Sequence, residues 1–205
     1  MSIIKLNNRA VKDATAVGSI TGLGNLILIK TQTASSSASI SFVDGASSVV
    51  LDNTYKEYIF TFNNIHPASD ANLTFNASAD TGSNYNIAAT TTLFEAYHNE
   101  ADSSAALAYS TSNDHAQDTG FKKLAISIGN GNDECASGYL HLFEPSSTNF
   151  LKHYMGVIQN YQSDNYSQAE HFAGYYNTTS AIDAIQFKMS SGNIDAGTIS
   201  LYGVV

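Results

Sequence analysis

Histidines and carboxylates are the side chains of this sequence that could carry chemistry. The chain has six histidines, and none of them falls in an HxH or HExxH spacing that lets two imidazoles bind one metal ion. The segment FEAYHNE brings His98 near Glu95 and Glu100, but alternation along a strand puts Glu95 on the face opposite His98. The sequence therefore predicts no metal site and no cofactor. The six histidines are His66, His98, His115, His141, His153 and His171.

Paired carboxylates could hydrolyse a glycosidic bond, for which two must lie roughly 5–10 Å apart. The chain has 18 acidic residues, but nothing in their spacing selects a pair. Nucleophile motifs of the form GxSxG and phosphate loops of the form GxxxxGK[ST] are absent. We therefore expect the chain not to be an enzyme. The glutamates expected on strands are Glu57, Glu95, Glu144 and Glu170.

Two further features of the sequence could carry chemistry, an acidic turn and a single thiol. The turn Gly129–Gly131, with Asp133 and Glu134, offers oxygen ligands but lacks the spaced acidic pattern of a calcium loop, which favours a tight turn. Cys135 is the single cysteine, which excludes an internal disulfide and a cysteine-based zinc site. It has no basic neighbour in sequence, so we expect an inert thiol.

Tyrosines offer a better indication of binding. The chain has 12 Tyr, 10 Phe and no Trp, and the stretch QNYQSDNYSQAEHFAGYYN combines tyrosine with amide and hydroxyl side chains. Such surfaces suit contacts with glycans or proteins, because each tyrosine provides a flat apolar ring and a hydroxyl. The alternative is that some of these rings cap the core. The candidate binding residues are Tyr161, Tyr166, Tyr175 and Tyr176.

Charge and hydropathy exclude two classes of partner. The formal net charge is −9 and only 13% of residues are charged. Lys122-Lys123 is the sole basic doublet, so a nucleic-acid partner is not expected. No stretch approaches the roughly 18 consecutive apolar residues of a membrane span, so none is expected.

Residues 1–25 differ from the remainder in charge and pattern. They carry a balance of +2, which leaves −11 for residues 26–205. Their apolar positions follow no sustained period, which fits either a frayed terminus or an arm that docks on a neighbouring subunit. We therefore divide the chain into an arm, 1–25, and a β domain, 26–205. The candidate assembly residues of the arm are Ile3, Lys5, Leu6, Arg9 and Lys12.

Alternating apolar residues predict the elements that position these side chains. Tyr58, Phe60 and Phe62 alternate with polar or smaller residues, and about ten such runs are separated by Gly, Asn, Asp and Ser. The one short run that could be helical is Ala105–Ala108. This pattern predicts an all-β fold, specifically an antiparallel two-sheet β-sandwich of jelly-roll type.

The closing segment TISLYGVV reads as a central strand. Ile199, Leu201 and Gly203 would then face the core while Ser200 and Tyr202 face outward, or the register is reversed.

Three segments of the sequence are distinctive: SFVDGASSVVLDNTYKEYIFTFNNIHPASD, FEPSSTNFLKHY and GYYNTTSAIDAIQFKMSSGNIDAGTISLYGVV. Together they resemble virion structural proteins of tailed phages, particularly those of marine cyanobacterial phages. The ending is the most specific, with I-x-F-x-x-S-S-G-N-I followed by G-T-I-x-L-Y-G. The similarity covers most of the chain from about Ser39 onward.

The resemblance implies a component of the phage particle and supplies no catalytic residue. We expect a capsid decoration or fibre subunit at the virion surface, anchored by the arm to other virion proteins and associated with itself, commonly as a homotrimer. The alternative is an adhesin module of the tail or fibre that binds polysaccharide of the host surface.

Overall fold

The computed structural model describes residues 16–17, 20–21 and 26–205, and every regular element in these ranges is a β-strand. All strand pairs are antiparallel. The described ranges contain no helix long and apolar enough to cross a membrane. The strands are β1 (Ala16–Val17), β2 (Ile20–Thr21), β3 (Leu26–Thr33), β4 (Ile40–Val43), β5 (Glu57–Pro67), β6 (Ala71–Ser78), β7 (Ala89–Asn99), β8 (Ala105–Tyr109), β9 (Lys122–Ile128), β10 (Ala136–Phe143), β11 (Lys152–Gln162), β12 (Tyr166–Tyr176), β13 (Ala184–Met189) and β14 (Ile194–Val204).

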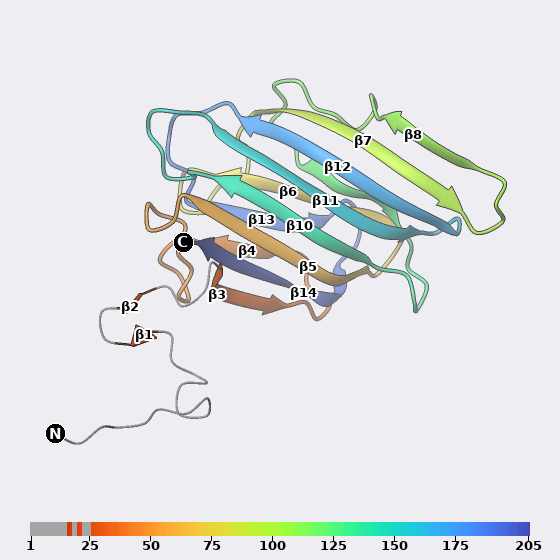
Figure 1. Cartoon of the computed structure of the whole chain (residues 1–205), viewed down its shortest axis with the longest axis horizontal. Coiled ribbons are helices and arrows are strands. Elements are labelled where there is room, and N and C mark those ends of the chain that lie inside the picture. Colours follow the sequence, from red (N-terminus) through yellow and green to blue (C-terminus); the bar gives the residue numbers. More distant parts are fainter. Residues whose placement is uncertain (1–15, 18–19, 22–25) are drawn as a thin grey trace, which may run out of the picture.

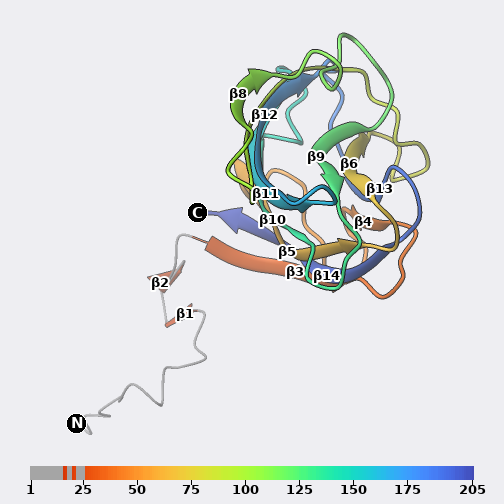
Figure 2. The same cartoon turned by 90° about the vertical axis from the view of Figure 1, so that its right-hand side faces the viewer.

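β3 to β14 form one 12-stranded sheet that curls back on itself (Figure 1). One part, which we call the long wall, has the order β8-β7-β12-β11-β10-β5-β14-β3, and the other, the short wall, has the order β9-β6-β13-β4. The walls join where Gln162 of β11 pairs with Ile128 of β9. Near the opposite edges, the side-chain amide of Gln32 donates to the carbonyl oxygen of Ser41 at 2.7 Å. The sheet is therefore nearly closed, as Figure 2 shows from the side.

The predicted all-β antiparallel class is confirmed. The finer prediction, a two-sheet sandwich of jelly-roll type, stays a prediction, because the Gln162–Ile128 pair joins the two walls in one continuous sheet. The run Ala105–Ala108, which the sequence left open as a helix, lies in strand β8, where Ala108 pairs with Glu95 of β7. The five candidate residues of the arm, Ile3, Lys5, Leu6, Arg9 and Lys12, lie outside the described residues.

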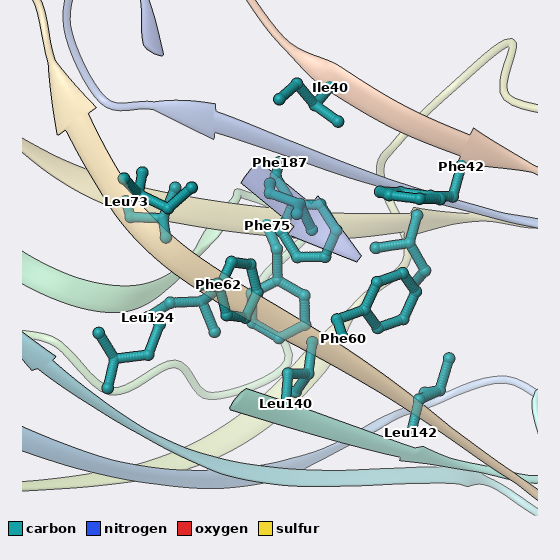
Figure 3. Packing of buried hydrophobic residues seen from close by; sticks show 14 of the residues in the cluster. Ile40, Phe42, Phe60, Phe62, Leu73, Phe75, Leu124, Leu140, Leu142 and Phe187 are labelled. Carbon is teal, nitrogen blue, oxygen red and sulfur yellow. The ribbon is translucent and has the colours of Figure 1, made fainter. Parts of the chain in front are cut away.

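Aromatic rings from both walls fill the space between them (Figure 3). Phe60 and Phe62 of the long wall and Phe75 and Phe187 of the short wall are at most 1% exposed. The centroid of the Phe187 ring lies 5.2 Å from the centroids of the Phe60 and Phe62 rings, and both pairs are edge to face. Edge-to-face pairs of this kind add to the free energy gained by burying the rings. The core therefore depends on contacts between strands that are distant in sequence.

The last strand takes the first of the two registers considered above. β14 lies between β3 and β5, with Ile199 and Leu201 in the core. Ser200 and Tyr202 point to the other face, where the Ser200 hydroxyl bonds to that of Thr31 at 2.8 Å. This register follows from burial, since one step of slippage would expose every core residue of the strand.

The buried ammonium group of Lys122 links the connection between β8 and β9 to the segment that precedes β7. Lys122 Nζ donates to the carbonyl oxygens of Ile87, Asp118 and Gly120 at 3.0, 2.9 and 2.6 Å. The side chain is 1% exposed, and this burial lowers the pKa of Lys122 to about 8. The ammonium thus replaces water as the partner of three carbonyl groups.

Lys122→Met should lower the free energy of unfolding by about 2–3 kcal/mol, because it leaves those carbonyls without their donor. Urea denaturation followed by circular dichroism would measure the change. Lys56→Met, at an exposed lysine that pairs with Glu144 at 3.3 Å, should change it by less than about 0.5 kcal/mol. Equal effects at the two lysines would contradict this role of Lys122.

Candidate functional site

The outer face of the long wall, meaning the side chains that point away from the core, is the first candidate site. Strand register assigns its rows, because directly paired residues share a face. One row runs Tyr109, Phe94, His171, Val157 and Tyr139 across β8, β7, β12, β11 and β10. A second row contains Thr92, Ala173, Met155, His141, Ile59, Tyr202 and Leu28. Figure 1 views the wall from this side.

Exposed apolar side chains concentrate on this outer face. Of the nine large hydrophobic residues that are exposed among the described residues, seven belong to it. Met155 is 53% exposed although it lies in the middle of the wall. Scattered apolar side chains are normal on a protein surface, whereas a gathering on one face indicates an interaction site. The seven are Leu26, Leu28, Phe94, Leu107, Tyr109, Tyr139 and Met155.

Stacked rings form a shallow groove on this face. The rings of Phe94 and His171 are parallel, with centroids 4.8 Å apart, and those of Tyr139 and His141 meet edge to face at 5.2 Å. Met155 lies among them in a groove of about 370 Å³. The groove is thus lined by rings that already contact one another.

Carboxylate and ammonium groups are scarce on the outer face. The two rows given above contain no Asp, Glu, Lys or Arg, and the carboxylate of Glu57, two residues before Ile59 in β5, bonds to His141 Nδ1. The chain as a whole carries a net charge of −9. The outer face is thus a region where an acidic partner can approach with little repulsion.

A second candidate lies on the opposite face of the same strands. We define the polar pocket by the side chains of Glu95, Tyr97, Gln162, Tyr166 and Gln168, which with Ser110, Ser112, Asn113 and Ile126 line a hollow of about 340 Å³. Gln162 donates to Gln168, and the Gln168 amide donates to Glu95 Oε2 at 2.6 Å. Three strands are therefore linked by one chain of hydrogen bonds between side chains.

Two carboxylates meet beside this pocket. Glu95 of β7 and Glu170 of β12 are directly paired in the sheet and share its inner face. Glu170 Oε1 accepts from the Ile126 amide at 2.9 Å, while Glu170 Oε2 is buried without a hydrogen-bond partner. Burial and the neighbouring Glu95 raise the pKa of Glu170 well above 4.5, and burial raises the pKa of Glu95. Sequence spacing could not select this pair, because strand pairing brings together residues 75 positions apart.

The four candidate tyrosines do not form one site. Tyr161 lies in β11 and Tyr166 lies in β12. Tyr161 and Tyr175 are on the outer face at opposite ends of the wall, and Tyr161 Oη donates to Glu100 at 3.0 Å. Tyr166 is in the polar pocket. Tyr176 is fully buried in the core and its hydroxyl has no hydrogen-bond partner there, so this ring offers no surface to a ligand.

The other candidate groups are separated in space. Described residues include no group of three or more His, Cys, Asp or Glu that could hold a metal ion. Glu57 and Glu144 lie away from the Glu95–Glu170 pair, and Glu144 pairs with Lys56. His98 Nε2 bonds to Asp102 at 3.0 Å, and Glu134 folds back to accept from the Gly131 amide.

Comparison of the chain with protein-family models, with curated proteins and with solved structures finds no match.

Proposed function

We propose that this chain is a structural subunit of a tailed-phage virion, a capsid decoration or fibre subunit at the particle surface and not an enzyme, whose outer face packs against neighbouring copies. The observation that carries the assembly role is the gathering of seven of nine exposed large hydrophobic residues on that face. The phage context comes from the resemblance of the sequence. A jelly-roll relationship of the curled sheet and a homotrimeric state belong to the same proposal.

The charge distribution supports association between copies of this chain. Two chains of net charge −9 repel each other at most surfaces. The two rows of the outer face that hold the exposed rings and Met155 contain no Asp or Glu, and the nearby carboxylate of Glu57 is engaged by His141. Burial of exposed rings and of Met155 between copies would supply the driving force.

Met155→Asp tests the interface. The wild-type chain should sediment as an oligomer, and the variant should dissociate with a Kd raised at least about tenfold, because a carboxylate would be buried without a partner. Thr179→Asp places the same charge at an exposed residue between β12 and β13 and should leave the mass unchanged. A wild-type chain that stays monomeric at all concentrations would reject the oligomer.

The virion assignment needs a separate measurement. Purified phage particles should contain the chain by mass spectrometry, and antibodies against it should label their surface in electron micrographs. Particles that lack the chain would reject the assignment even if the chain oligomerises alone.

A further inference from the structure

The inner face of the long wall changes from apolar to polar along β7 and β12. Leu93 and Phe172 are paired across β7 and β12 and lie in the core. The next inner-face pair along the same strands is Glu95 with Glu170, and the following one is Tyr97 with Gln168. A sheet that only had to cover a core would continue with apolar residues here.

The polar rows are partly open to solvent. Tyr97, Tyr166 and Glu95 are half-buried, and the hollow above them is walled by Ser110, Asn113 and Ile126. The rings of Tyr97 and Tyr166 meet nearly at right angles, at 80°, with centroids 5.6 Å apart. The pocket therefore combines two aromatic surfaces with hydroxyl, amide and carboxylate groups.

The hydrogen bonds inside the pocket hold its polar groups in fixed positions. Gln168 is 3% exposed and is oriented by Gln162 on one side and Glu95 on the other. Within the described residues, no other hydrogen bond reaches the Glu95 carboxylate. Glu95 therefore keeps acceptor capacity for a ligand, and Ser112 is exposed at the rim.

The chemistry of the lining narrows the class of ligand. The carboxylate of Glu95 repels anions such as phosphate or sulfate esters. The amides and hydroxyls disfavour a purely apolar ligand, because their hydrogen bonds to water would be lost without replacement. A neutral pyranose is neither anionic nor purely apolar. Its hydroxyls donate and accept hydrogen bonds, and its ring presents an apolar face to tyrosine.

We propose that the polar pocket binds a neutral saccharide unit, with Glu95 and Gln168 hydrogen-bonded to its hydroxyls and the ring of Tyr166 against its apolar face. The site lies on the opposite face of the sheet from the assembly surface and does not depend on that proposal. Met155→Asp should leave saccharide binding unchanged.

An array of neutral oligosaccharides containing glucose, galactose, mannose and N-acetylglucosamine tests the proposal. The wild-type chain should bind at least one of them, and titration calorimetry with that oligosaccharide should give an affinity reduced at least about tenfold in Tyr166→Ala. Tyr175→Ala is the matched control, because Tyr175 lies on the same strand but on the outer face, and should change the affinity by less than about twofold. Glu95→Gln should also weaken binding while keeping the side-chain volume.

Circular dichroism and thermal unfolding of each variant would establish that it is folded. Three results would overturn the proposal: no binding of any neutral oligosaccharide by the folded wild-type chain, binding restricted to acidic glycans, or equal losses in Tyr166→Ala and Tyr175→Ala.

Discussion

Replacing Phe187 by alanine is expected to lower the free energy of unfolding by about 3–5 kcal/mol, the cost of emptying a ring-sized space in a tightly packed core. Phe187 of β13 is fully buried. Its ring meets Phe60 and Phe62 of the opposite wall at 5.2 Å and Phe42 of its own wall at 6.3 Å. The substitution would remove contacts on both sides of the core at once.

Urea denaturation of the purified chain would measure this loss. Phe150→Ala is the matched control, because Phe150 is 69% exposed, and it should change the free energy of unfolding by less than about 0.5 kcal/mol. Since small domains are commonly stable by only about 5–15 kcal/mol, Phe187→Ala should also give little folded protein at elevated temperature. A loss below about 1 kcal/mol would mean that the walls do not meet through Phe187.

Replacing Glu170 by glutamine is expected to stabilise the chain at neutral pH and to flatten its dependence on pH. The raised pKa of Glu170 means that, above about pH 4.5, the unfolded chain has lost a proton that the folded chain keeps. The folded state then binds more protons, so the free energy of unfolding falls by about 1.4 kcal/mol for each unit of rising pH, up to the folded-state pKa.

A glutamine side chain can occupy the position of Glu170, and it has no group that gains or loses a proton in this pH range. Its oxygen can accept from the Ile126 amide, as Glu170 Oε1 does. Its NH₂ group then occupies the place of Glu170 Oε2, which has no partner as a carboxylate oxygen. The advantage of the variant should therefore grow as the pH rises from 4.5 toward 7.5.

Denaturation curves of both proteins at several pH values would measure that difference. Glu144→Gln, at a surface glutamate paired with Lys56, should not show it. Curves for wild type and Glu170→Gln that remain parallel across this range would contradict a proton held by Glu170. Any pH dependence of the free energy of unfolding in this range would then have to come from another group, such as Glu95, which is paired with Glu170 from β7.

Local patterns predicted the strands with the clearest alternation and failed where alternation breaks. Tyr58, Phe60 and Phe62 all face the core as expected. In β9 the backbone of Ser127 has a φ of 53°, and the pairing with β6 shifts register. Ile126 is therefore half-buried, whereas Leu124 and Ile128, two positions to either side, are fully buried.

The hairpin between β11 and β12 shows a second limit of prediction from local composition. The stretch from Tyr161 to Tyr166 is rich in Gln, Asn and Ser, which indicates a loop by composition. Both strands nevertheless extend into it, because Gln162 pairs with Tyr166 and with Ile128 of the short wall. Pairing partners outweighed local propensity at these residues.

The sequence by itself determined that the chain is all-β, which residues of most strands face the core, and that His98 and Glu95 lie on opposite faces, because the strand period of two is a local property of the backbone. Tertiary structure alone decided which strands are neighbours. That choice buried Tyr176, placed Glu95 beside Glu170, put Tyr166 in the polar pocket and gathered Phe94, Tyr139 and Met155 on the outer face. Partner strands are selected by packing across the whole molecule, and no spacing along one chain records that selection.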